Sequence, residues 1–272
     1  FGETDNSDLS EQAIQLVRIP QYTDVTVQSG GSVTAAAWDG ETGGIVAFRA
    51  MGVVTVESGG TILADEMGYW AGETGTAYNN DGFQGESYAG EGDGNLPPSG
   101  GYYGNWAAGY YQNNYGGGGA MITGGGGNYG GGATEGASWT GGSYPEAEAG
   151  DTYGDDALSQ VFLGSGGAGV WYGASSPGPG GDGAGIVFIA ANEVVATDTA
   201  SICAIGGTTA YWATGTWTYG AGGGAGGTIW LVADTLTLPA DSVDASGGFG
   251  ESTHTRVGGD GGYGRVRLDY NV

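Results

Sequence analysis

The 272-residue chain contains no lysine, one cysteine, one histidine and seven prolines. A single cysteine excludes an intramolecular disulfide framework, and its place in the apolar run 201–205 predicts that Cys203 is a small buried side chain. The scarcity of proline and the lack of a continuous G-x-y period exclude a collagen triple helix. Apolar runs such as 186–191 are far shorter than the roughly 20 residues that a membrane span needs, so we expect no span.

Positive charge is almost absent as well. Five arginines face 30 acidic residues, which gives a formal net charge of -25. Such a chain repels phosphate backbones and anionic membrane surfaces, so we expect it not to bind nucleic acid. Cations, basic proteins and neutral glycans remain as partners. An acidic excess also suits high salt, where screening weakens self-repulsion.

Catalytic side chains are equally scarce. The only histidine, His254, lies in the polar stretch 251–255, which is typical of a solvated loop, and no G-x-S-x-G elbow occurs. Adjacent acids such as Asp155 and Asp156 point to opposite faces if they lie in a strand. We therefore expect no enzymatic activity. An acidic-polysaccharide lyase is kept as a remote alternative, although no lysine is present to act as its base.

Glycine and aromatic residues are what the sequence has in abundance. Its 64 glycines would by themselves indicate low-complexity disorder. Eight Trp, 17 Tyr and six Phe argue against this, because disordered chains are poor in large rings. We therefore expect a folded chain that uses glycine as a building material.

Internal repeats indicate how the chain folds. The apolar stretch 44–50 returns at 185–191 after a shift of 141 and at 227–233 after a further shift of 42, and a partial copy occupies 264–269. Each full copy continues into a second short apolar run and a turn rich in small residues. Repeats of this length predict a stacked architecture. We expect an all-β fold, either a solenoid-like β-helix or a β-sandwich, with at most one short N-terminal helix.

Two regions stand apart from the repeats. Residues 1–22 form an N-terminal arm, and 23–272 form one β-repeat domain with a glycine-rich and aromatic-rich insertion at about 67–185. The arm fits either a short amphipathic helix or an extended strand. The sequence begins at Phe1 and not at Met, and no charged segment followed by an apolar one, typical of a signal peptide, comes after it. We interpret this as a processed form or a fragment. The apolar side chains of the arm are candidates for assembly contacts: Ile14, Leu16, Val17 and Ile19.

The glycine tracts of the insertion allow two interpretations. They are flexible linkers, or they pack as extended threefold, polyglycine-like helices whose backbones approach closely because nothing projects from Cα. We prefer the second interpretation, because linkers rarely carry so many Tyr and Trp residues.

Two segments carry a resemblance to known proteins. The stretches 226–231 (GGTIWL) and 259–268 (GDGGYGRVRL), together with strand–Gly-Gly–strand copies around a glycine-rich middle, resemble glycine-rich, β-helix-like surface proteins. These include secreted bacterial fibre proteins and tail-fibre adhesins of tailed viruses. The resemblance implies an extracellular, cell-surface or virion-surface role. The lysine-free acidic composition is similar to that of proteins from salt-adapted organisms, such as haloarchaea.

Two speculative ligand sites follow from the residue types. Acids on glycine-rich turns offer the hard oxygens that Ca²⁺ prefers. The alternative is that they are turn residues whose carboxylates accept backbone hydrogen bonds. These acids are Asp93, Asp151, Asp155, Asp156 and Asp182. Aromatic rings beside polar groups are typical of glycan binding. The alternative is that these rings pack on layers of glycine-rich backbone or between subunits. These rings are Tyr102, Tyr103, Trp106, Tyr110, Tyr111 and Trp139.

The leading expectation is a non-enzymatic extracellular structural protein. It would form a homo-oligomer or polymer, as the subunit of a surface fibre or filament, through contacts of sheet edges and the N-terminal arm. The alternative is a glycan-binding adhesin, either a viral tail fibre or a cell-surface protein.

Overall fold

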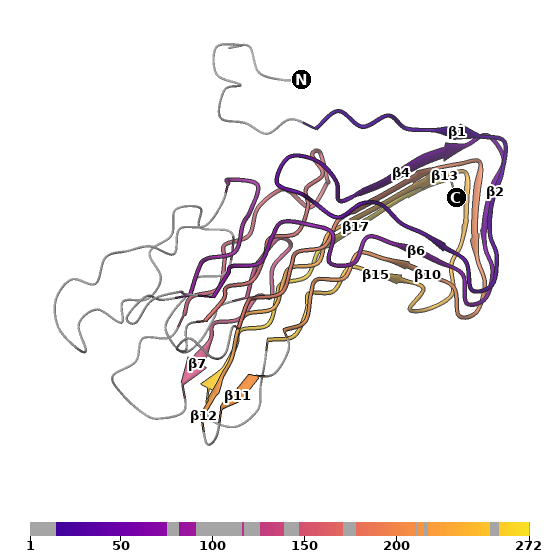
Figure 1. The fold of residues 1–272 in the computed structure, drawn as a ribbon. Helices are drawn as coiled ribbons and strands as arrows, with labels where there is room; N and C mark the ends of the chain where they lie inside the picture. Colours follow the sequence, from indigo (N-terminus) through magenta and orange to yellow (C-terminus); the bar gives the residue numbers. More distant parts are fainter. Residues whose placement is uncertain are drawn as a thin grey trace, which may run out of the picture.

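The computed structural model describes residues 15–74, 82–90, 116, 126–138, 147–170, 178–209, 212–214, 217–250 and 256–271. Within these ranges the protein is all-β, with no helix. Its strands form three parallel sheets and two small antiparallel pairs. Figure 1 shows the three sheets at one end of the molecule and the antiparallel pairs at the other.

The first sheet has the order β1-β4-β8-β13-β17, and all its pairs are parallel. Its strands are β1 (Gln21–Tyr22), β4 (Ile45–Ala50), β8 (Ile186–Ala190), β13 (Thr228–Ala233) and β17 (Arg265–Tyr270). β4 pairs with β8 at a residue offset of 141, and β8 with β13 at a further offset of 42. The repeat spacing read from the sequence is therefore the register of this sheet.

The other two sheets each have four strands, again all parallel. The second sheet has the order β14-β9-β5-β2 and contains β2 (Val25–Val27), β5 (Val53–Val56), β9 (Glu193–Ala196) and β14 (Thr235–Thr237). The third has the order β15-β10-β6-β3 and contains β3 (Ser32–Val33), β6 (Thr61–Leu63), β10 (Ser201–Cys203) and β15 (Val243–Asp244). The chain visits the sheets in rotation, first, second, third, and then returns to the first.

We call these three sheets the three-sheet body. Alternation along each strand sends one set of side chains inward, where they line up in rows from strand to strand. In the first sheet Val46, Val187 and Ile229 form one such row, and Phe48, Ile189 and Leu231 form another. Burial of these β-branched and aliphatic side chains is the main hydrophobic stabilisation of the body, at about 25 cal/mol per Å² of apolar surface. The arrangement is compatible with a solenoid.

Corners between the sheets are bonded through the backbone. The Asn192 and Glu193 N–H groups donate to the Gly52 carbonyl, and the Asp234 N–H donates to the Asn192 carbonyl. A Cβ on Gly52 would displace the Asp24 carboxylate, which accepts from the Val53 N–H at 2.8 Å. The turn between the second and third sheets uses Gly59 at a φ of 76°, which glycine adopts without strain.

Glycine-rich segments extend from the corner between the third and first sheets, and Figure 1 shows them as a set of long, nearly parallel runs. We call the described parts of 64–185, 204–227 and 245–264 the glycine bundle. The antiparallel pairs lie at its far end: β7 (Ala137–Ser138) with β16 (Arg256–Val257), and β11 (Trp212–Thr214) with β12 (Trp217–Tyr219).

Hydrogen bonding in the bundle has a period of three residues. The segment 222–227 shows it most clearly, because its N–H groups donate to three neighbours in rotation. Gly222 donates to Ala168 and Ala225 to Ser165, in the first neighbour. Gly223 donates to Gly259 and Gly226 to Gly262, in the second. Gly224 donates to Gly207 and Gly227 to Ala204, in the third. Three other segments donate to its carbonyls, from Gly127, Gly181 with Ala184, and Gly248. Three directions per turn are those of an extended threefold helix.

This packing leaves no room for side chains at the contact points. A Cβ on Gly224 would lie within 3.0 Å of the Asp182 and Gly181 carbonyl oxygens, and one on Gly227 would overlap the Gly185 carbonyl. Glycine is required here by close approach of backbones and not by backbone conformation, because neither position has a positive φ.

Candidate functional site

The end of the three-sheet body at β17 exposes part of the core. β17 pairs with β13 on one side only, so it is an edge strand of the first sheet. Val266, Leu268 and Tyr270 extend the inward rows of β13, yet they are 45, 40 and 56% exposed. No described strand of the second or third sheet lies level with β17 to cover them. The inward face of β17 is therefore an open apolar surface.

The strands next to this surface continue it. Leu236 on β14 and Val243 on β15 lie at the same end of the second and third sheets, and both are only partly buried against the core. A hollow of about 570 Å³ lies beside Leu268 and Tyr270, and Ala233 and Asp234 also line it. We call Leu236, Val243, Val266, Leu268 and Tyr270 the open end.

At the opposite end of the body the arm covers the first sheet. Residues 15–20 run without regular secondary structure into β1, whose two residues pair with Arg49 and Ala50. The Pro20 carbonyl accepts from the Arg49 N–H at 3.0 Å, and the Tyr22 ring contacts Phe48 edge-on, with 6.3 Å between centroids. Together they cover the inner row of β4.

The predicted assembly residues lie partly in this arm. Leu16 is 94% exposed, Ile19 is 37% exposed and Val17 is half-buried, so the arm presents apolar side chains to solvent. Ile14 lies outside the described residues. The predicted helix has no counterpart in 15–20, and the rest of its range lies outside the described residues.

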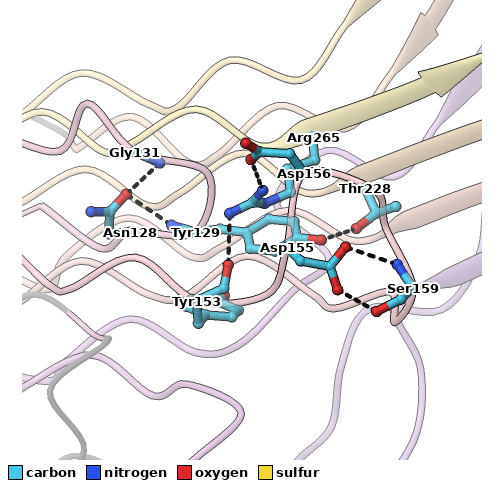
Figure 2. A network of polar contacts seen from close by, with 9 residues as sticks. All are labelled: Asn128, Tyr129, Gly131, Tyr153, Asp155, Asp156, Ser159, Thr228 and Arg265. Atoms are coloured by element: carbon cyan, nitrogen blue, oxygen red, sulfur yellow. Dashed lines mark hydrogen bonds and ion pairs between the residues drawn. The ribbon is translucent and has the colours of Figure 1, made fainter.

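Two of the predicted calcium ligands make other contacts in a polar network on the bundle (Figure 2). The Ser159 hydroxyl and N–H donate to Asp155, and these bonds lower the pKa of that carboxyl. The Asp156 carboxylate forms an ion pair with Arg265, which also donates to the Tyr153 carbonyl at 2.9 Å. This turn gives Leu158 a φ of 48° and buries its side chain.

The other candidate acids lie elsewhere. Asp151 is exposed, and Asp182 is partly buried where its Oδ1 accepts from the Ala71 N–H at 2.7 Å. Burial raises the pKa of Asp182. Among the described residues no three metal-ligating side chains gather at one point, and Asp93 lies outside them.

All six predicted glycan-binding rings lie outside the described residues, as does His254. Cys203 is buried as predicted, and burial raises the pKa of its thiol to about 11.

A buried aromatic cluster is the feature that sequence reasoning missed. Tyr129 stacks on Tyr153 with 4.8 Å between centroids, and Phe162 packs edge-on against both. The Tyr129 hydroxyl bonds with the Thr228 hydroxyl at 2.9 Å, as Figure 2 shows. Burial raises the pKa of both tyrosines. Rings separated by 9 to 33 residues in a glycine-rich stretch give no periodic signal that would have grouped them.

A second missed site is the buried carboxylate of Glu86. The Trp38 indole N–H donates to it at 2.9 and 3.1 Å, and the Trp70 backbone N–H donates at 3.0 Å. These donors satisfy a charge that would otherwise be costly to bury. The carboxylate therefore links the segment between β3 and β4 to the glycine bundle, and it is a structural contact.

No protein-family model, curated protein or solved structure matches this chain. The described part of the chain contains no helix able to cross a membrane.

Proposed function

We propose that this protein is a non-enzymatic, extracellular structural subunit that polymerises end to end into a surface fibre. The observation that carries the proposal is the open end, where inward core positions lie exposed on the edge strand β17. In a solenoid such an end requires a cap or a neighbour. A second copy is the neighbour that we propose.

The two ends of the body support this choice because their apolar rows match. By the register of the second sheet, Val25 and Leu236 occupy one row. By that of the third sheet, Val33 and Val243 occupy one row. All four side chains are partly buried against the core. Stacking one copy on another would join each row to its own continuation.

The test is electron microscopy of the purified protein together with one matched pair of variants. Leu268→Asp places a charge in the open end, whereas Met51→Asp places one on a corner side chain that is 75% exposed. We expect polymers from the native protein and from Met51→Asp. From Leu268→Asp we expect folded monomers with an unchanged circular dichroism spectrum. Native protein that stays monomeric at high concentration and high salt contradicts the proposal.

A glycan-binding adhesin is the second candidate, and one observation favours it. Val170 and Gly178 bridge, the Phe83 N–H donates to the Glu73 carbonyl, and β11 pairs with β12, so described residues on the two sides of 75–81, 171–177 and 215–216 lie next to each other. The bonds of Gly222 to Ala168 and of Gly169 to the Phe83 carbonyl join these flanking residues within the bundle.

Binding residues are often carried by connecting segments that a rigid scaffold positions. The test is a glycan array with the native protein, followed by Trp106→Ala and Trp139→Ala. Glycan binding that both variants lose supports the adhesin. An array without binding, and variants that still adhere to cells, contradict it.

A further inference from the structure

The three sheets contain unequal numbers of strands. The first sheet has five, and the second and third have four each. Because the chain visits the sheets in rotation, β17 lies one level beyond β14 and β15. A second copy that continues the second and third sheets places its β2 on β14 and its β3 on β15. Its own β1 then falls at the level that β17 already occupies.

One of these two strands must give way, and the arm is the weaker of the two. β1 pairs with β4 through two residues, whereas β17 pairs with β13 through six. The arm segment 15–20 has no regular secondary structure, and Leu16 within it is 94% exposed. β4 has six residues, the same length as β17, so β4 offers a full ladder to a six-residue strand.

The chemistry along this alignment is complementary. Carrying the row positions of the first sheet into the next copy sets β17 beside β4 with Val266 opposite Val46 and Leu268 opposite Phe48. Both pairs lie on the inward, apolar face. On the outward face Asp269, which already forms an ion pair with Arg267 of its own strand, falls opposite Arg49, whose side chain is exposed and has no ion pair within the described residues. Opposite charges directly across a ladder are favourable.

We propose that β17 of one copy takes the place of the N-terminal arm of the next copy and pairs with its β4 in this register. The partner is thus a second copy of this chain, and the inference rests on the proposed function. Leu268 then covers Phe48 in the place of Tyr22. The displaced arm is free to leave the sheet without uncovering the core.

Cysteine cross-linking tests the register directly. The double variant Arg49→Cys/Asp269→Cys brings two thiols together only between copies. Within one copy three strand steps, about 14 Å at the usual spacing, separate the positions, and a disulfide needs Cα atoms within about 7 Å. We expect mild oxidation to give a ladder of covalent oligomers that reductant collapses to monomer.

Two controls make the result specific. Arg49→Cys/Arg267→Cys keeps both thiols on the outward face but two residues out of register, and we expect at least tenfold less cross-linking. Mixing the single variants Arg49→Cys and Asp269→Cys is expected to give covalent dimers and nothing larger. Polymers that do not cross-link, or that cross-link equally in the out-of-register control, overturn the inference and leave the proposed function standing. Absence of polymers in the native protein overturns both.

Deleting residues 1–22 supplies a separate readout. If β17 replaces the arm, the deletion removes a competitor and polymerisation becomes several-fold faster by light scattering. If instead the arm itself joins neighbouring copies, the deletion abolishes polymers and leaves monomers, which overturns the inference. The control is Leu16→Ser in the full chain. It keeps the arm but removes this exposed apolar side chain, so it shows whether a change in solubility alone alters the rate of polymerisation.

Discussion

Arg49 and Asp269 occupy one row of the first sheet, three strands apart. The ladder runs from Arg49 through Ala190 and Val232 to Asp269 without a register shift. Beyond Arg49 the row continues to Gln21 of β1, so Arg49 becomes the end of the row, opposite in charge to Asp269 at the other end, when the arm leaves β4. Contacts between such unlike ends are heterologous, and a heterologous contact that does not close into a ring grows as a filament.

The first prediction concerns the glycine bundle. Gly224→Ala places a Cβ against two backbone carbonyl oxygens in the middle of the bundle. Backbone cannot move aside as a side chain can, so we expect a loss in the free energy of unfolding at the upper end of overpacking, about 3 kcal/mol. Chemical denaturation measures it. Gly178→Ala is the control, because its new Cβ meets only a Val170 methyl, and it should cost clearly less. Equal losses would mean that the bundle is loosely packed.

The second prediction concerns the aromatic cluster. The Tyr153 hydroxyl donates to the Leu163 carbonyl at 2.6 Å and accepts from the Ser165 hydroxyl at 3.0 Å, all in the buried interior. Tyr153→Phe leaves both partners unsatisfied and should lower the free energy of unfolding by about 1–3 kcal/mol. Thermal denaturation followed by near-ultraviolet circular dichroism measures it. Tyr263→Phe, on a ring that is 66% exposed, should change little. An unchanged free energy of unfolding in Tyr153→Phe would show that water reaches the cluster.

The third prediction is a pH dependence with a defined sign. Burial raises the pKa of Asp182, so its charged form weakens the fold at pH 7 and this cost falls as the pH drops towards 4. Asp182→Asn should therefore stabilise the protein most at pH 7, by an amount that shrinks towards pH 4. Melting temperatures across this range measure the difference.

Asp39 supplies the opposite case as a control. Backbone hydrogen bonds from Thr42 and Glu41 lower its pKa, so its contribution to stability is present above the ordinary value of 3.8 and is lost below it. Asp39→Asn should therefore destabilise at pH 7 and lose its effect in acid. The same sign for both variants would contradict the assignment.

The fourth prediction concerns salt. Copies that each carry a formal charge of -25 repel one another at low ionic strength. Raising NaCl from about 10 mM to 1 M shortens the Debye length from about 30 to 3 Å, so polymerisation should become at least tenfold faster, although the Arg49–Asp269 pair itself is weakened. Light scattering follows the rate. Slower assembly at high salt would indicate that ion pairs, and not the apolar rows, hold the copies together.

The body was predictable because its signals are local. Short apolar runs at 45–48, 186–189 and 228–231 mark the strands, and the spacing of these copies equals the register of the first sheet. The small-residue turns between the second and third sheets were also visible, since Gly30 and Gly59 adopt the positive φ that glycine allows.

The bundle and its sites were less predictable because their contacts are distant in sequence. Asp182 bonds to Ala71 across 111 residues, and Arg265 pairs with Asp156 across 109. Glycine carries no pattern that selects one neighbouring segment over another. Residue type alone left calcium ligands and turn residues as alternatives for Asp155 and Asp156, and the fold shows Asp155 bonded within a turn and Asp156 paired with an arginine.

The sequence by itself determined that the chain is all-β and that its strands repeat, because these follow from short apolar runs and turn chemistry within each segment. Only the tertiary structure decided that the first sheet has one strand more than the others. That difference depends on which segments stack on one another, and stacking is a relation between segments that local periodicity does not record.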